Sequence, residues 1–263
     1  MTRIFGRTLA VLALLLVPFV ANAQDEDEAP GTLIMHGAIT PKAGQVSQFM
    51  DAMKAHIEWR TDNRDPWEWS AYRMETGPAQ SVLHYRSDLI RWADIDAYES
   101  SDFYKQARAH FSETVGPHVA GFDSWIDQVD MELSHWAEGA SGNLVELYTY
   151  TLKHGKYYPW HQAASKMTAA LKDANWRSFG WIQTYTGGRV NVVTLVVPHA
   201  NWASFELPDQ SVRAIVTEAY GEEQAKELFA QFTDAVISEE GHVARYLPEL
   251  SLRRVKAAAA SAQ

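Results

Sequence analysis

An α+β fold made of two similar halves, each with the order β-α-β-β-α-β, is predicted by three features of this 263-residue sequence. First, the sequence repeats itself: residues 31–45 and 142–156 share residue types at a constant offset, 142 − 31 = 111. Second, strand-like and helix-like patterns follow each copy in the same order. Third, each copy has a Thr-x-Lys-x-Gly turn after its first strand. Such a repeat sets the number of units, so it is considered before the fold.

The repeat continues along both halves with little drift. The offset is 111 at the start, 110 in the middle (202 − 92) and 117 near the end (250 − 133). A tandem duplication explains this conserved order better than chance. The matched residues are Leu33 with Leu144, Thr40 with Thr151, Lys42 with Lys153, Gly44 with Gly155, Thr76-Gly77 with Thr186-Gly187, Trp92-Ala93 with Trp202-Ala203, and Glu132-Leu133-Ser134 with Glu249-Leu250-Ser251.

In the first copy, Val46, Phe49, Met50, Met53 and Ile57 have the spacing of one helical face, which predicts a helix. Alternating large and polar residues predict strands, and a Gly-Pro pair supplies a hairpin turn. The predicted order is strand 33–40, helix 46–60, strands 67–75 and 81–86, helices 94–100 and 103–115, and strand 125–133.

The second copy repeats this order. Pro159 falls in the first turn of a helix, where a missing N–H costs nothing, and Gly187-Gly188 forms a hairpin turn. The offset grows by 117 − 110 = 7 residues, about two helical turns, and we place this insertion in the second helical region. The predicted elements are strand 144–151, helix 158–174, strands 178–186 and 190–197, a helical region 208–238 interrupted near Gly221, and strand 246–253.

This order of elements is that of a ferredoxin-like unit. Its antiparallel sheet has helices on one face, and the bare face must be covered. Two such sheets in one chain can cover each other, with the helices outside. We therefore predict two units, residues 31–135 and 142–254, packed sheet to sheet. Neither half is expected to be stable alone, because each would expose a large apolar face.

Residues 146–156, ELYTYTLKHGK, resemble the opening strand and turn of NIPSNAP-type proteins, which begin with a similar E-L-x-x-Y-x-L-x-x-G-K run. The first copy matches more weakly, with His36 and Ile39 in place of Leu147 and Tyr150. NIPSNAP-type proteins belong to the dimeric α+β barrel superfamily, with cofactor-independent monooxygenases and haem-binding chlorite dismutase-like proteins. The resemblance implies an intrachain dimeric α+β barrel. It implies no particular reaction, because a shared fold does not fix a function.

Residues 1–23 have the pattern of a cleavable signal peptide: a basic start, an apolar run over 9–20, and Ala21-Asn22-Ala23 as the cleavage site. A membrane anchor is the alternative, but the run is shorter than the ~20 residues that a bilayer needs. Residues 24–30 are an acidic segment and residues 255–263 an Ala-rich tail, both expected to be disordered. We therefore expect a periplasmic or secreted protein.

Charge and cysteine content exclude several functions. The formal net charge is −10, and it is 21 − 33 = −12 without the two arginines of the leader. With no basic stripe, we expect no binding to nucleic acid, and none to an anionic membrane after the leader is cleaved. The chain has no cysteine, which excludes disulfides, thiol chemistry and Fe–S ligation. The chain could also form a homo-oligomer.

Strand alternation supplies the candidate ligand-binding residues. In strand 144–151, we assign Val145 and Leu147 to the helix side, and Glu146, Tyr148 and Tyr150 to the cavity between the sheets. The same reasoning applies to both hairpins. The complete set of candidates is Glu146, Tyr148, Trp181, Gln183, His84, Arg73, Arg86 and Trp69.

Each candidate also has a structural alternative. Glu146 could be a general base with a raised pKa, or a carboxylate paired with Arg73 or Arg86. His84 could bind a metal or haem or move protons, or it could be a buried histidine with satisfied hydrogen bonds. Trp92 and Trp202, equivalent by repeat, are expected to fill the same core niche beneath the second helix.

No short motif assigns a catalytic residue. The sequence has no HExxH, no Walker loop, no GxSxG and no helix-opening GxGxxG, so we expect no metal or cofactor. Haem stays open through the family resemblance. We expect an exported protein that binds a small apolar or aromatic molecule between the two sheets. The alternatives are a cofactor-independent monooxygenase, a haem-dependent enzyme, and a protein–protein module without a ligand.

Overall fold

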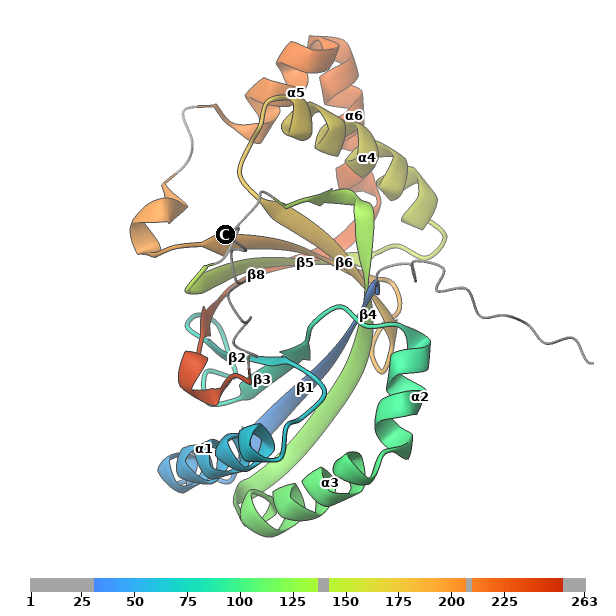
Figure 1. The fold of residues 1–263 in the computed structure, drawn as a ribbon. Helices are drawn as coiled ribbons and strands as arrows, with labels where there is room; N and C mark the ends of the chain where they lie inside the picture. Colours follow the sequence, from blue (N-terminus) through green and yellow to red (C-terminus); the bar gives the residue numbers. More distant parts are fainter. Residues whose placement is uncertain (1–30, 137–141, 207–209, 253–263) are drawn as a thin grey trace, which may run out of the picture.

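The computed structural model describes residues 31–136, 142–206 and 210–252, and within them eight strands form one closed antiparallel barrel (Figure 1). The strand order around the barrel is β1-β3-β2-β8-β5-β7-β6-β4. Strands β1 to β4 belong to the first unit and β5 to β8 to the second. The predicted pair of ferredoxin-like units in an intrachain α+β barrel is confirmed.

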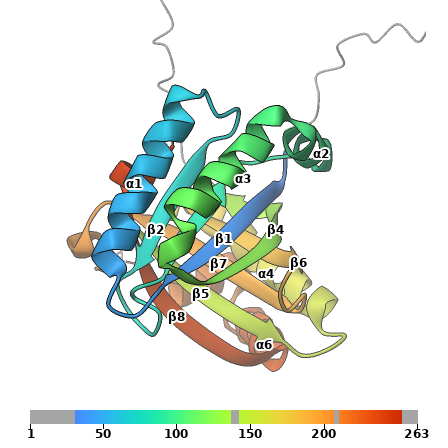
Figure 2. The same cartoon turned by 90° about the horizontal axis from the view of Figure 1, so that it is seen from below.

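The helices lie outside the barrel, and Figure 2 shows α1 and α3 side by side over the sheet of the first unit. The first unit contains β1 (Leu33–Pro41), α1 (Val46–Asp62), β2 (Trp69–Met74), β3 (Leu83–Ser87), α2 (Trp92–Ser100), α3 (Asp102–Thr114), η1 (Gly116–His118) and β4 (Val119–His135). The second unit contains β5 (Leu144–Leu152), α4 (Tyr157–Asp173), β6 (Phe179–Thr186), β7 (Val192–His199), η2 (Trp202–Phe205), α5 (Val212–Tyr220), α6 (Glu222–Asp234), β8 (Val236–Tyr246) and η3 (Pro248–Leu250).

The repeated turn after the first strand of each unit has one structural role. Lys42 Nζ donates to the carbonyl oxygen of Pro117 at 2.7 Å, and Lys153 Nζ donates to the equivalent carbonyl of Asp234. Each lysine thereby ties the first turn to the start of the last strand of its own unit. The glycine of each turn has a positive φ, 76° and 74°, which explains why both copies keep it.

Two seams join the units by backbone pairing. At the first seam, β4 pairs with β6 from Ile126↔Thr186 to His135↔Phe179. At the second, β2 pairs with β8 through Tyr72↔Tyr246, Arg73↔Arg245 and Met74↔Ala244. Hydrogen bonds between the sheet edges therefore close the barrel, in addition to the packing of one sheet on the other.

The end of each unit reaches into the other unit, and the repeated Glu-Leu-Ser sequence makes this contact. Ser134 Oγ accepts the N–H of Trp181 at 3.0 Å, and Ser251 Oγ accepts the N–H of Ala71 at 2.9 Å. The neighbouring Leu133 and Leu250 are buried in the helix–sheet core of the opposite unit. This exchange agrees with the prediction that neither half folds alone, which stays a prediction.

Three sequence predictions need correction. The last strand is Val236–Tyr246 and not 246–253, because pairing with β5 along its length outweighs the helical character of its acidic residues. The insertion lies before α5 and not within the helices. The matching helices have equal lengths, 9 residues in α2 and α5 and 13 in α3 and α6, so nothing is inserted inside them. The starts of α2 and α5 already differ by 212 − 92 = 120. The fourth strand also begins earlier than predicted, at Val119.

Trp92 and Trp202 do not fill a core niche. They are 46% and 49% exposed, at the first residues of α2 and η2. The Trp92 ring lies 5.2 Å from that of Tyr185 in the other unit. Trp92 precedes the buried residues of α2, Ile95 and Tyr98, whereas η2 has no buried residue at all.

The expected signal peptide, acidic segment and C-terminal tail lie outside the described residues. Among the helices that the structure does describe, none is both long and apolar enough to span a membrane.

Candidate functional site

The strand faces in the second unit are opposite to those predicted. Tyr150 lies 5.4 Å from Phe232 of α6, and Trp181 lies 5.1 Å from Trp160 of α4, ring centre to ring centre. Their side of the sheet therefore faces the helices. Glu146, Tyr148, Tyr150, Trp181 and Gln183 share that side, so their assignment to the barrel interior is wrong.

The first unit divides the remaining candidates. His84 and Arg86 face the barrel interior, because the alternating residues Leu83 and Tyr85 pack against α1. Arg73 shares a face with Ala71, which also packs against α1, so it lies on the helix side. Trp69 lies on that side too, where the guanidinium of Arg60 is 5.3 Å from its ring. The interior assignment is wrong for Arg73 and Trp69.

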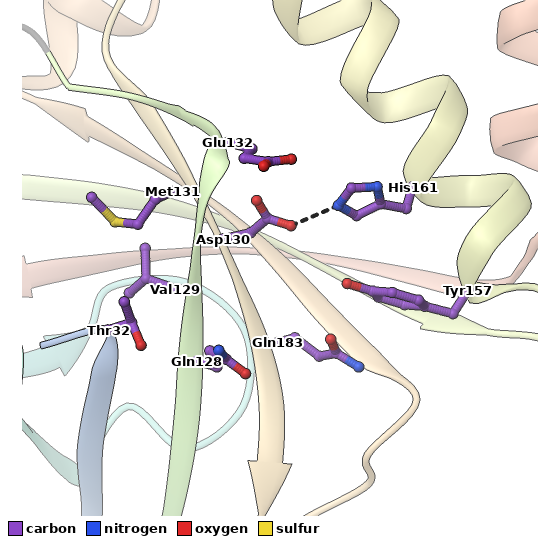
Figure 3. A pocket seen from close by; sticks show the side chains of 9 residues that line it. All are labelled: Thr32, Gln128, Val129, Asp130, Met131, Glu132, Tyr157, His161 and Gln183. Carbon is purple, nitrogen blue, oxygen red and sulfur yellow. Dashed lines mark hydrogen bonds and ion pairs between the residues drawn. The ribbon is translucent and has the colours of Figure 1, made fainter. Parts of the chain in front are cut away.

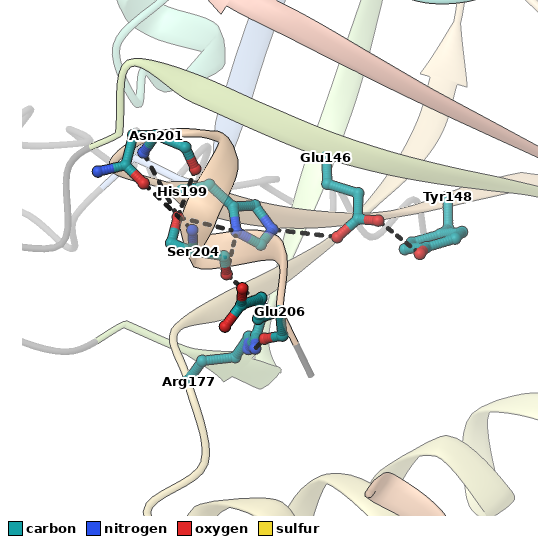
Figure 4. Close-up of polar contacts among 7 residues, drawn as sticks. All are labelled: Glu146, Tyr148, Arg177, His199, Asn201, Ser204 and Glu206. Carbon is teal, nitrogen blue, oxygen red and sulfur yellow. Dashed lines mark hydrogen bonds and ion pairs between the residues drawn. The ribbon is translucent and has the colours of Figure 1, made fainter. Parts of the chain in front are cut away.

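Glu146 belongs to a polar network near the start of β5 (Figure 4). Its carboxylate accepts a hydrogen bond from Tyr148 Oη at 2.6 Å and lies 3.0 Å from His199 Nε2. Burial, followed by Glu146, raises the pKa of Tyr148 to about 12, so this hydroxyl stays a donor. The expected structural alternative for Glu146, a paired carboxylate, is right in kind, but the partner is a histidine and not an arginine.

His199 in this network is a structural residue. Its ring is buried, Nδ1 lies 3.0 Å from the carbonyl oxygen of Ser204, and Phe205 stacks on it at 3.8 Å. The Ser204 hydroxyl donates to the carbonyl of Asn201 at 2.7 Å. Both ring nitrogens thus face acceptors. Because both of its ring nitrogens are occupied, His199 has no free nitrogen with which to act as a base and activate the Ser204 hydroxyl as a nucleophile.

The barrel interior holds a second polar cluster, in the first unit. His36 stacks on Trp125 at 4.9 Å, and its Nε2 lies 3.1 Å from Asp127. His84 is nearby, and burial, followed by the charge of His36, lowers its pKa. Among the described side chains, Nε2 of His84 is buried without a hydrogen-bond partner. A buried polar atom left unpaired costs roughly 1–3 kcal/mol, so this is a place to hold water or a polar ligand group.

A cavity of about 330 Å³ opens at the first seam, between β4, β6 and α4 (Figure 3). Its walls come from both units, because β4 ends against the first helix of the second unit. The lining residues are Thr32, Gln128, Val129, Asp130, Met131, Glu132, Tyr157, His161 and Gln183. Gln183 is the predicted candidate that this cavity includes.

Asp130 and His161 form the chemical centre of this cavity. Asp130 Oδ2 lies 2.9 Å from His161 Nε2, and Asp130 Oδ1 accepts the N–H of Leu133 at 2.9 Å. His161 Nδ1 lies 3.4 Å from Ser165 Oγ, one turn along α4. Each carboxylate oxygen has a second lone pair, so the fixed Asp130 can accept a further proton or hydrogen bond from a ligand.

Tyr157 adds a donor at the same wall, one helical turn before His161. Burial raises the pKa of Tyr157, and the charge of Asp130 adds to the shift. Its hydroxyl therefore stays protonated at neutral and mildly alkaline pH. The cavity combines a fixed acceptor, a neutral donor and the amides of Gln128 and Gln183.

The sequence did not single out Asp130, Tyr157 or His161. Asp130 lies within the strand predicted over 125–133, and His161 lies within the helix predicted over 158–174. The two residues are 31 positions apart and come from different units. The repeat itself was the available signal, because it predicts that the last strand of one unit meets the other.

The described residues contain no group of three His, Cys, Asp or Glu side chains placed to hold a metal ion. Histidine is one of the residues that hold a haem iron in proteins, and it does so through a free ring nitrogen. In the seam cavity, His161 directs Nε2 at Asp130. His84 has an unpartnered Nε2 but is not among the residues that line this cavity. Neither of these two histidines therefore offers the seam cavity a free Nε2 for a haem iron.

No family model matches the chain, and neither does any curated protein sequence. Solved structures do match it. A candidate monooxygenase from Lactobacillus acidophilus NCFM has a TM-score of 0.52 at 10% identity, covering 82% of this chain and 94% of its own. A candidate monooxygenase from Fusobacterium nucleatum has a TM-score of 0.53 at 8% identity, covering 86% and 96%.

A chlorite dismutase variant from Candidatus Nitrospira defluvii also matches, with a TM-score of 0.51 at 8% identity, covering 83% of this chain and 93% of its own. These neighbours are dimeric α+β barrel proteins, and the closed barrel with outer helices is the fold that they share with this chain. At such low identity the likeness concerns the fold and not the reaction.

Proposed function

We propose that this protein is an enzyme that oxidises a small organic molecule with molecular oxygen in the cavity at the first seam. The observation that carries the proposal is the Asp130–His161 pair, 2.9 Å apart, at the wall of that cavity. Support comes from the fold, which two candidate monooxygenases share. The first step of the reaction is the expected binding of a small apolar or aromatic molecule.

Asp130 is the proposed general base. It takes a proton from an activated C–H or O–H group of the substrate, a step that typically contributes 10²–10⁴-fold to the rate. His161 is a positioning residue that fixes the carboxylate through Nε2. The Tyr157 hydroxyl is the proposed donor to the substrate oxygen, on which negative charge develops as the proton leaves.

A reaction of this kind balances without an external reductant. A CH2 group next to an aromatic ring or carbonyl becomes a ketone, one atom of O2 enters the product, and the other leaves as water with both hydrogens. We infer a neutral substrate, because the ionisable carboxylates of the lining, Asp130 and Glu132, would repel an anion. The amides of Gln128 and Gln183 would bind its polar groups.

The proposal places this activity outside the cytoplasm, as the leader sequence predicts. A NIPSNAP-like relationship is compatible with it, on the strength of residues 146–156. A binding protein without turnover is the second candidate, favoured by the small size of the cavity and its hydrogen-bonding amides. Both candidates use the same site, so one experiment separates them.

The test combines native mass spectrometry of protein from its own host with oxygen uptake. The first identifies a co-purified molecule, and the second follows turnover of that molecule and of phenols and aryl ketones with acidic CH2 groups. We expect Asp130→Asn to lower turnover by about 100-fold or more. Asp123→Asn, an exposed carboxylate on the same strand, is the matched control and should keep full activity.

Unchanged turnover in Asp130→Asn would exclude the proposed base. A retained ligand with no oxygen uptake by the unmodified protein would instead identify a binding protein.

A further inference from the structure

Solvent reaches the interior of the barrel. In β7, Val193 and Val197 face the helices and are 2% exposed, whereas Thr194 and Val196 face the interior and are half-buried. The same alternation holds along β3, where the interior-facing side chains are again the more exposed ones. Since the strands form a closed barrel, this exposure means that solvent enters it. The interior of an eight-stranded barrel is wide enough to hold one small ligand.

The two opposite walls of this interior have diverged since the duplication. Strands β3 and β7 are four places apart in the order of eight strands, so they lie on opposite sides of the barrel. At the offset of 110, His84 and Arg86 of β3 correspond to Thr194 and Val196 of β7. The fold therefore does not require a histidine or a cation at these positions. Further interior-facing residues of the second unit are aliphatic: Val145, Leu147, Ile182 and Val192.

Arg86 is a half-buried cation whose protein partners are neutral. Its Nε donates to Tyr72 Oη at 3.4 Å and its Nη1 to the carbonyl oxygen of Ser87 at 3.3 Å. Within the described part of the chain, no carboxylate pairs with it. The interior-facing carboxylates of Asp123 and Glu240 are exposed to water. A guanidinium has five N–H donors, so Arg86 keeps donors and an uncompensated charge for an anion.

His84 adds a donor beside this cation. It lies two residues before Arg86 on the same face of β3, and its Nε2 is buried without a hydrogen-bond partner among the described side chains. The interior carboxylate of Asp127 has partners of its own: His36 Nε2 lies 3.1 Å from it, and Trp125 Nε1 donates to it at 3.2 Å. Asp127 therefore does not neutralise Arg86.

We propose that the barrel interior binds a small organic acid, a carboxylate carried on an apolar body. The carboxylate would accept hydrogen bonds from the remaining N–H groups of Arg86 and from His84 Nε2. The apolar body would pack on Leu147 and Val196 of the opposite wall. Charge selects this class, because a neutral amide of the same shape gains no ion pair and an amine is repelled by the guanidinium. None of these four residues lines the cavity at the first seam.

Three probes of nearly the same shape test the proposal by calorimetry on the whole protein: phenylacetate, phenylacetamide and phenethylamine. We expect the acid to bind about tenfold more tightly than the amide, because a hydrogen-bonded ion pair is stronger than a neutral hydrogen bond. The amine should bind most weakly. Binding of the acid should weaken as ionic strength rises. Arg86→Val, which copies the second unit, should remove most of the preference for the acid over the amide.

Arg73→Val is the matched control, because it removes the same charge from the neighbouring strand but on the helix side. It should keep the preference for the acid. Val196→Trp tests the location: it fills the interior opposite Arg86 and should weaken the binding of acid and amide alike. Melting curves check that each variant folds, and Arg86→Gln gives the same test if Arg86→Val does not. Equal binding of acid and amide, no acid binding at millimolar concentration, or equal losses in the Arg86 and Arg73 variants would each overturn the proposal.

Discussion

The two seams that close the barrel are related by the repeat, and they differ in what surrounds their shared contacts. At the first seam, the end of β4 meets α4, and Asp130 contacts His161 at the wall of a cavity. At the second, the end of β8 leads to η3, which meets α1. There Leu247 takes the place of Asp130 (247 − 130 = 117) and Met50 that of His161 (161 − 50 = 111). Both belong to one hydrophobic cluster.

The strand pairs beside these residues differ in the same way. Gln128 and Gln183 are partners in the first seam, and Arg245 and Arg73 are the equivalent partners in the second. Both arginines bind Glu75, with nitrogen–oxygen distances of 2.9 and 3.2 Å. The second seam is therefore closed by apolar packing and ion pairs, whereas the first keeps neutral amides around an open space.

The comparison of the two seams distinguishes the positions that hold the fold together from the positions of the candidate site. Positions that hold the units together, such as Ser134 and Ser251, are the same in both seams. Positions around the cavity have diverged. Substitutions at the shared positions should therefore have equal effects at both seams, and substitutions at the diverged positions should not.

The largest expected effect is on the shared leucines. Leu133→Ala and Leu250→Ala should each lower the free energy of unfolding by about 2–5 kcal/mol, because these side chains are 1% and 0% exposed in the core of the opposite unit. Urea denaturation measures the effect. Met131→Ala, 49% exposed, is the control and should change stability by less than about 0.5 kcal/mol. A large effect at one seam alone would contradict the equivalence of the two.

The shared serines come next. Ser134→Ala and Ser251→Ala each leave a backbone N–H without its partner, that of Trp181 or Ala71. An unsatisfied buried N–H costs about 1–3 kcal/mol, so both variants should lose stability by that amount. Ser124→Ala, on the exposed part of β4, serves as the control in the same denaturation series. If water replaces the hydroxyl at either site, the loss there would fall below this range.

The repeat made the barrel predictable, whereas the faces of its strands were not. Two similar β-α-β-β-α-β halves need a cover for their sheets, and this need leads directly to a paired arrangement. The strand β5, however, has apolar residues on both of its sides. In β5, Val145 and Leu147 are as apolar as Leu144 and Tyr150, so alternation does not distinguish the interior from the helix side. This ambiguity explains the reversed assignment of Glu146.

The candidate site was less predictable than the fold. Asp130 and His161 meet only because closure of the barrel brings the last strand of one unit against the first helix of the other. No local spacing encodes that contact. His84 and Arg86 were correctly assigned to the interior, where their role as ligand-binding residues stays a prediction.

The next prediction concerns the pH dependence of stability, and it compares the first helices of the two units. His56 of α1 is buried, with Nδ1 2.9 Å from His110 Nδ1, and its equivalent in α4 is Met167 (167 − 56 = 111). Burial, then Arg60 and His110, lowers the pKa of His56 to about 3. Between about pH 6.5 and pH 3 the unfolded chain binds this proton and the folded chain does not. Stability is therefore lost as the pH falls through this window.

We expect a loss of about 1 kcal/mol between pH 7 and 5.5 from this group alone. Denaturation at several pH values measures it. His56→Met, which copies the second unit, should flatten the acid dependence, and His154→Met, an exposed histidine, should not. The same slope in all three proteins would show that His56 is not the group responsible.

The smallest effect on stability, and the sharpest test of the comparison, comes from copying the second seam into the first. His161→Met gives the first seam the residue found at Met50. Because the His161 and Asp130 side chains are 25% and 21% exposed, their pairing is worth about 0–1 kcal/mol, and the melting temperature should change little. Ligand retention, measured by native mass spectrometry, should fall because Asp130 loses the partner that fixes it.

The reciprocal Met50→His places an imidazole against buried Leu247 with no carboxylate opposite, so it should cost more stability and create no ligand site. If His161→Met instead destabilises the protein more than Met50→His and leaves ligand retention unchanged, the pair at the first seam is structural, and the cavity is not the site of function.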